Sequence, residues 1–114
     1  MKRVHASDEL HYFVGGKTAL GIQPCSEECA SQFKQGAAGL HHLCFRAKSR
    51  QDIDDFHKFL KSVNAVVVRE PQEGPWAHGY YHLIFEDPNG VRLEINYVPE
   101  SRAISARKYV QSVK

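Results

Sequence analysis

Apolar and polar residues alternate along three stretches in the second half of the chain, a pattern typical of β-strands with two different faces. Within residues 40–47, Leu43 and Phe45 fall on one side and polar residues on the other. The stretches 80–86 and 91–98 alternate in the same way. Residues 65–69 contain three consecutive valines, which favour a strand over a helix. This half of the chain therefore predicts four strands.

One amphipathic helix is predicted between the first and second of these strands. Apolar residues recur there at helical spacing and form a single stripe, made of Ile53, Phe56, Phe59, Leu60 and Val63. Ser49 suits the N-cap, and Asp52 three residues later completes a variant of the capping box. Further along, the Asp-Pro-Asn-Gly sequence at 87–90 predicts a tight turn between the last two strands.

The first half of the chain predicts less structure. Two short strand-like runs, 10–14 and 18–23, flank Gly15-Gly16, so we predict a β-hairpin over residues 10–23. Residues 24–38 are predicted to be a linker with one helical turn near 27–33. We expect a single α+β domain over 1–114, with a βαβββ module at 39–99. Residues 100–114 form a basic tail, either helical or a solvated end.

Composition narrows the classes of protein. The chain has 114 residues, 42% hydrophobic and 25% charged, as in small globular domains. The net charge is +2 with the basic residues spread out, which argues against a nucleic-acid binder. No apolar run approaches the roughly 18 residues of a membrane span. Three cysteines without an export signal predict reduced thiols in a cytoplasmic protein.

The polar sides of the strands carry residue types that are unusual for a solvated sheet. They are His42, Arg46, His82, Arg92, Glu94 and Asn96. Imidazole and carboxylate together suit Zn²⁺, Fe²⁺, Mn²⁺ or Ni²⁺. His42 and Glu94 would converge if their strands are neighbours; otherwise both are ordinary polar residues on an open face. Trp76 and Tyr80 would either line a pocket mouth or pack over the sheet edge.

Two other constellations use the cysteines. Cys25 and Cys29, with His41 and His42, have a spacing that a zinc site permits. Adjacent residues on a strand point to opposite faces, which disfavours that site. Cys44 is a weak candidate nucleophile because no helix N-terminus is predicted beside it.

Residues 39–47 and 79–95 resemble the opening strand and closing hairpin of the vicinal oxygen chelate superfamily, the glyoxalase, bleomycin-resistance and extradiol-dioxygenase group. The most specific part is the turn at 87–90, followed four residues later by Glu94. The resemblance implies a curved, mixed sheet that binds a small molecule in a cup, with lyase, isomerase or dioxygenase chemistry dependent on a divalent metal. It implies His42 and Glu94 as metal ligands, and Glu94 as the catalytic residue. The ligand-binding residues expected around them are Arg46, Trp76, Tyr80, His82, Arg92 and Asn96.

The chain departs from that family pattern in its first half. Family chains usually have two modules, whereas residues 10–23 resemble only the last hairpin of one. Gly21 stands where that hairpin would carry a ligand, and Gln23 is one strand step further on. One chain therefore supplies two metal ligands. Either a homodimer shares the site across a two-fold axis, or the protein is a metal-free binding or drug-resistance protein, or an inactive truncated member.

Overall fold

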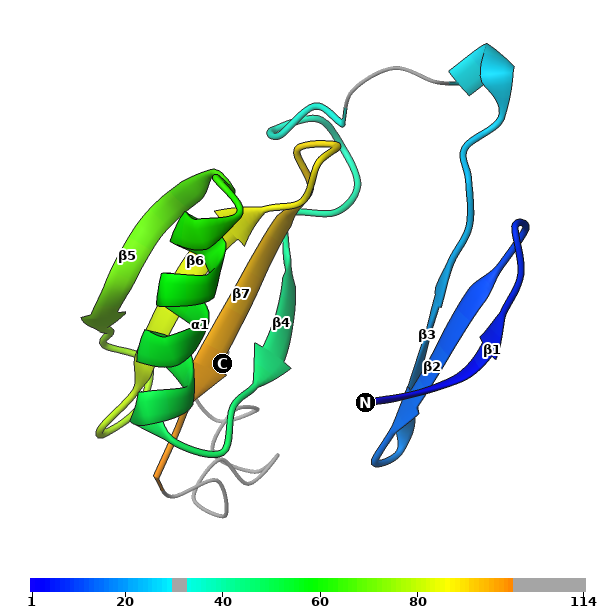
Figure 1. Ribbon diagram of the computed structural model, residues 1–114. Coiled ribbons are helices and arrows are strands. Elements are labelled where there is room, and N and C mark those ends of the chain that lie inside the picture. The colour runs from blue at the N-terminus through cyan, green and yellow to red at the C-terminus, as the bar shows by residue number, and fades with distance from the viewer. Residues whose placement is uncertain (30–32, 100–114) are drawn as a thin grey trace, which may run out of the picture. The chain divides into compact units, whose positions relative to one another are not determined.

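The computed structural model describes residues 1–29 and 33–99 and confirms the α+β class. The chain divides into two compact units, Met1–Ser31 and Gln32–Lys114 (Figure 1). None of the described helices is long and apolar enough to cross a membrane. The predicted basic tail at 100–114 lies outside the described residues. The single-domain assignment stays a prediction.

The first unit is an antiparallel sheet in the order β1-β2-β3. Its strands are β1 (Lys2–Ala6), β2 (His11–Gly15) and β3 (Thr18–Ile22). Gly15 pairs with Thr18, and Gly16 has a φ of 60°, so the expected hairpin is present. Strand β1 was not predicted, because its basic residues show no clear two-sided pattern. A short 3-10 helix, η1 (Glu27–Cys29), falls where one helical turn was expected.

The second unit is a complete βαβββ module. Its elements are β4 (Leu43–Arg46), α1 (Arg50–Ser62), β5 (Val67–Glu73), β6 (Tyr81–Glu86) and β7 (Arg92–Tyr97). The sheet order is β4-β7-β6-β5, with β4 parallel to β7 and the other pairs antiparallel. The first strand of the module therefore lies beside the last, which makes the strands of Cys44 and Glu94 neighbours.

Strand β5 extends further than the sequence predicted. A strand was expected to end at Arg69 and a loop to begin at Pro71, yet β5 continues through Pro71 to Glu73. It is an edge strand, where the missing N–H of a proline is tolerated. Its register against β6 shifts twice, the first time between Val67 and Arg69. Such bulges re-aim side chains, and this one lies beside the candidate site.

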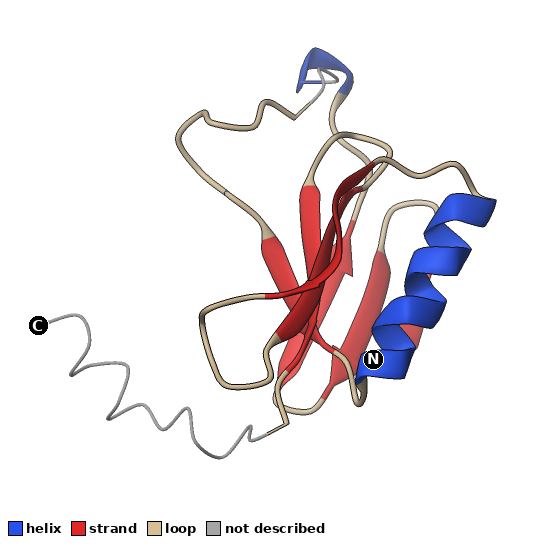
Figure 2. Cartoon of the chain, turned by 90° about the vertical axis from the view of Figure 1, so that its left-hand side faces the viewer, coloured by secondary structure: helices blue, strands red, loops and turns tan. Residues whose placement is uncertain are grey.

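Helix α1 covers one face of the sheet (Figure 2). Its N-cap is as predicted, because the Asp52 backbone N–H donates to Ser49 Oγ at 3.1 Å. Ile53 and Leu60 pack against Leu83 of β6 to form the core. Phe59 is 54% exposed, so the buried stripe is narrower than its spacing suggested.

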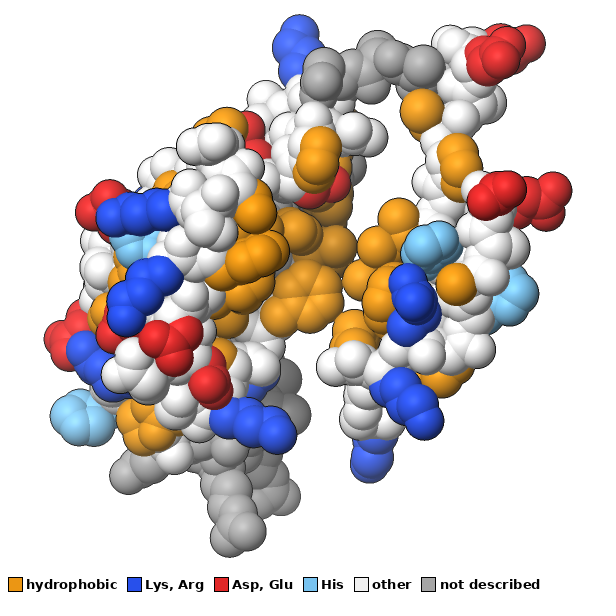
Figure 3. All heavy atoms as spheres, in the orientation of Figure 1, with side chains coloured by type: hydrophobic (Ala, Val, Ile, Leu, Met, Phe, Trp, Pro, Cys, Tyr) orange, Lys and Arg blue, Asp and Glu red, His pale blue; other side chains and the backbone are white. Residues whose placement is uncertain are grey.

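The solvent side of α1 mixes basic and acidic side chains and does not present a basic patch (Figure 3). The opposite face of the sheet is left uncovered by this helix, and it carries the polar residues singled out in the sequence.

Candidate functional site

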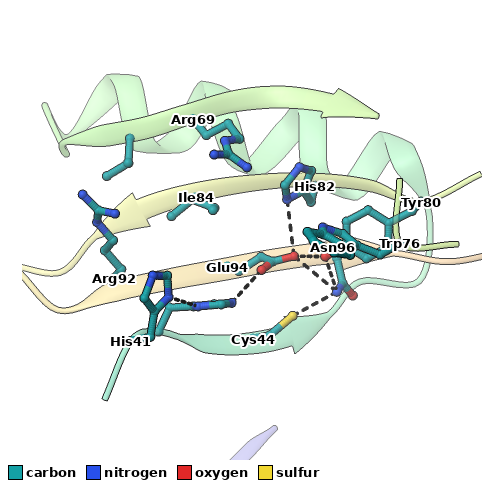
Figure 4. A pocket seen from close by; sticks show the side chains of 12 residues that line it. His41, Cys44, Arg69, Trp76, Tyr80, His82, Ile84, Arg92, Glu94 and Asn96 are labelled. Atoms are coloured by element: carbon teal, nitrogen blue, oxygen red, sulfur yellow. Dashed lines mark hydrogen bonds and ion pairs between the residues drawn. The ribbon is translucent and has the colours of Figure 1, made fainter. Parts of the chain in front are cut away.

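A cavity of about 600 Å³ lies on the sheet face opposite α1 (Figure 4). Its volume is within the range of small-molecule sites. All its lining residues come from the second unit, and those at its centre are His42, Cys44, Tyr80, His82, Glu94 and Asn96. The strand order explains the gathering: Glu94 on β7 pairs with Cys44 on β4 and with Ile84 on β6.

Glu94 lies in the middle of this cluster and interacts with most of its members. Only 6% of the residue is exposed. Its Oε2 lies 2.9 Å from His42 Nε2, and its Oε1 accepts a hydrogen bond from the Tyr80 hydroxyl. Asn96 Nδ2 lies 3.5 Å from the same Oε1 and 3.1 Å from the Tyr80 oxygen. The carboxylate is thus held from both sides before any ligand arrives.

His82 is buried with an unused polar atom. The residue is 3% exposed, and its Nδ1 lies 3.3 Å from Glu94 Oε1. The orientation of the two groups is not that of a hydrogen bond, so Nδ1 has no such partner among the described residues. Asn96 Oδ1 is in the same condition. Because buried polar atoms normally have partners, these two atoms are exceptions, and both belong to residues that line the cavity.

His41 and His42 sit together and do not point to opposite faces. Their Nδ1 atoms are 2.7 Å apart, and both residues line the cavity. The expectation that adjacent strand residues point to opposite faces does not apply to them, because β4 begins only at Leu43.

The electrostatics of the cluster favour an ionised Glu94. Burial by itself would raise the pKa of this carboxyl. The hydrogen bond from Tyr80 and the neighbouring His82 and His42 outweigh burial, and they hold the pKa of Glu94 below its ordinary value. Burial first, and then the hydrogen bond to Glu94, raise the pKa of Tyr80. The two shifts agree, since a phenol that donates to a carboxylate keeps its proton.

Cys44 is a poor nucleophile in this setting. The residue as a whole is exposed, but its sulfur is partly shielded and lies 3.0 Å from Asn96 Nδ2. Burial and the adjacent Glu94 charge raise the pKa of the thiol to about 11. The thiolate is the reactive form, so this thiol is almost wholly unreactive near neutral pH.

We therefore expect alkylation of Cys44 by iodoacetamide at pH 8 to be at least about tenfold slower than that of exposed Cys25. Peptide mass spectrometry over time measures both rates in one sample. Glu94→Gln removes a charge that raises the pKa and should speed Cys44 alone. Equal rates at the two cysteines would contradict the raised pKa.

The structure brings most of the sequence-predicted site residues to this one cavity. Those lining it are His42, Trp76, Tyr80, His82, Arg92, Glu94 and Asn96. Trp76 stands at the rim and is 74% exposed. Arg46 is exposed and does not line the cavity. Val68 and Arg69 also line the cavity, which the sequence did not predict. Three consecutive valines show no alternation of apolar and polar residues, and the bulge in β5 changes which side chains face the cavity.

The His42–Glu94 pair fits two positions of a divalent metal site. Two ligands about 2.1 Å from one ion, at the right angle of octahedral coordination, stand about 3 Å apart. The observed separation of Nε2 and Oε2 is 2.9 Å. The described residues bring together no group of three His, Cys, Asp or Glu side chains able to hold an ion.

Comparisons with known proteins agree with the fold. The family model of the Glyoxalase/Bleomycin resistance protein/Dioxygenase superfamily matches residues 1–95. A candidate glyoxalase from Bacillus halodurans is similar at 26% identity and a TM-score of 0.73, covering 85% of this chain and 74% of that one. A glyoxylase/bleomycin resistance protein/dioxygenase domain from Frankia is 22% identical (TM-score 0.67; 88% and 75% covered). A lactoylglutathione lyase from Agrobacterium tumefaciens is 20% identical (TM-score 0.57; 84% and 74% covered). Comparison with curated proteins gave no match.

Proposed function

Because the chain belongs to the Glyoxalase/Bleomycin resistance protein/Dioxygenase superfamily, we propose that it binds a small molecule in the cavity on β4–β7, beside a divalent metal held in part by His42 and Glu94. The observation that carries this proposal is the 2.9 Å approach of these two side chains at the cavity. Such an ion, when bound, supplies Lewis-acid polarisation of a ligand's oxygen atoms. The activity would be that of a lyase, isomerase or dioxygenase.

The surrounding residues would position the ligand and the carboxylate. Tyr80 and Asn96 fix the orientation of Glu94 from within the fold, as supporting partners of metal ligands do. His82 and Asn96 line the cavity beside Glu94 and would contact the ligand there. Trp76 would cover the ligand from the rim.

The remaining metal ligands would come from a second copy of the chain. Two copies related by a two-fold axis would contribute two histidines and two glutamates. In support, β4 is an edge strand of its sheet, and Leu43 within it and Leu40 before it are exposed apolar residues. The free thiols of Cys25 and Cys44 fit a reducing compartment such as the cytoplasm.

One observation favours a second candidate, a metal-free binding or resistance protein. Both oxygens of Glu94 already have partners, Oε2 with His42 and Oε1 with Tyr80. A carboxylate so engaged can serve as a fixed acceptor in a binding cavity without an ion.

Native mass spectrometry combined with elemental analysis separates the two candidates. We expect a dimer carrying divalent metal, with the metal lost in both Glu94→Gln and His42→Ala. His57→Ala is the matched control, because His57 lies in α1, on the opposite face of the sheet from the cavity, and should leave metal content unchanged. A metal-free dimer after incubation with Zn²⁺, Ni²⁺, Mn²⁺ and Fe²⁺ would rule out the metal site and favour the second candidate.

A further inference from the structure

The charges along the cavity are arranged unevenly. The charged side chains that line it, apart from the histidines, are Arg69, Arg92 and Glu94. Glu94 is already bonded to His42 and Tyr80, so its charge is largely compensated locally. Arg69 has no ion pair among the described residues, and Arg92 has only a long 4.0 Å ion pair with Glu86, so the cavity carries surplus positive charge.

One hydrogen-bond donor of the Arg92 side chain has no partner among the described residues. Its Nε is buried and has no hydrogen-bond partner within residues 1–29 and 33–99. The Glu86 carboxylate is 4.0 Å from this nitrogen, which is too far for a hydrogen bond. The Arg92 side chain is 32% exposed and lines the cavity, so the remaining N–H groups of its guanidinium are available there. A guanidinium suits a planar anionic group such as a carboxylate or phosphate.

The strand geometry sets where an anion would lie. Arg92, Glu94 and Asn96 point to one face of β7, and alternate residues on a strand are about 6.6 Å apart. Figure 4 shows Arg92 at one end of this row and Trp76 beside Asn96 at the other end. Ile84, the Glu94 partner on β6, supplies an apolar wall between them.

We propose that the cavity binds an elongated aryl anion, with its carboxylate or phosphate at Arg92 and its ring at Trp76. The middle of the molecule would pass over Ile84 and present its polar atoms to the Glu94 cluster. This inference rests on the proposed small-molecule function and names the class of ligand for that cavity.

The chain carries its own reporter for this binding. Trp76 is the only tryptophan and stands at the cavity rim, so its fluorescence responds to occupancy. The purified protein would be titrated with 4-phenylbutyrate, with phenylpropyl phosphate and with neutral 4-phenylbutyramide. We expect at least one anion to bind at least about tenfold more tightly than the amide, since charge-assisted hydrogen bonds are the stronger kind. The relative affinity of the two anions shows whether Arg92 binds a carboxylate or a phosphate more tightly.

Variants test whether Arg92 is the cause. Arg92→Ala should weaken anion binding by about tenfold or more, and Arg92→Lys should retain part of it, because it keeps charge but not the planar fork. Lys58→Ala is the matched control: it removes one positive charge from α1, on the other side of the sheet. Thermal melts would verify that all variants fold.

These measurements distinguish a failure of the anion assignment from a failure of the proposed function. Equal affinity for acid and amide, or equal weakening by Arg92→Ala and Lys58→Ala, would overturn the anion assignment while leaving the cavity a binding site. Absence of a fluorescence change with all three compounds would also overturn it, and the metal measurement would then decide the proposed function independently.

Discussion

Replacing Leu83 with alanine is expected to lower the free energy of unfolding by about 2–5 kcal/mol, the usual range for a buried leucine. Leu83 is 0% exposed and meets Ile53 and Leu60 of α1 at the centre of the core. Truncation removes apolar contacts on the sheet side of the helix and leaves a cavity that this small core cannot easily close. Urea denaturation followed by far-ultraviolet circular dichroism measures the loss.

Phe59→Ala provides the contrast for that experiment. Phe59 belongs to the same apolar stripe in the sequence but is 54% exposed. Its truncation should cost well under half of the Leu83→Ala value, although a larger side chain is removed. If the two variants lost the same stability, α1 would be packed with a different face toward the sheet.

Replacing Glu94 with glutamine is expected to destabilise the metal-free protein, in the presence of a chelator, by about 1–3 kcal/mol at pH 7. Tyr80 and His42 would lose a charged acceptor, and hydrogen bonds to charged groups are worth about this much. Glu73→Gln is the control, because the Glu73 side chain is 72% exposed and pairs with Arg50 at the surface. Exposed pairs contribute about 1 kcal/mol or less.

The difference between wild type and Glu94→Gln should also depend on pH. The pKa of Glu94 is lower in the folded protein than its ordinary value of 4.5. A carboxyl of this kind stabilises the fold fully above its ordinary pKa, and this contribution is lost as the pH falls through the folded pKa. Urea titrations should show the same difference in the free energy of unfolding between wild type and Glu94→Gln at pH 7 and 5, and a smaller difference at pH 3.5. A gap that widens in acid would mean that Glu94 is protonated in the fold.

Much of the second unit could be predicted because its local signals agree with one another. Alternation placed His82 and Glu94 on one side of their strands, and the helical stripe supplied a cover for the other side. The N-cap at Ser49 and the turn at 87–90 fixed where elements begin and end. The turn has its expected form: Asp87 Oδ1 accepts from the backbone N–H of Asn89 and Val91.

The features that escaped prediction depend on contacts between distant segments. Residue spacing cannot show that Tyr80, just outside β6, donates to Glu94 on β7. Nor does it show the bulge that directs Val68 and Arg69 to the cavity, because a run of valines has no polar side. Strand β1 has few apolar residues and is defined by its pairing with β2.

The parallel pairing of β4 with β7 bears on when the candidate site forms during folding. Leu43 and Leu93 are partners fifty positions apart, whereas β5, β6 and β7 join consecutive neighbours. Closing the longest loop has the largest entropic cost, so β4 is expected to dock last. Its amide hydrogens should in turn be the first of this sheet to exchange with solvent. A molecule with β4 undocked would keep the helix and the three-stranded sheet but would no longer hold His42 against Glu94, so this pair is lost before the rest of the module unfolds.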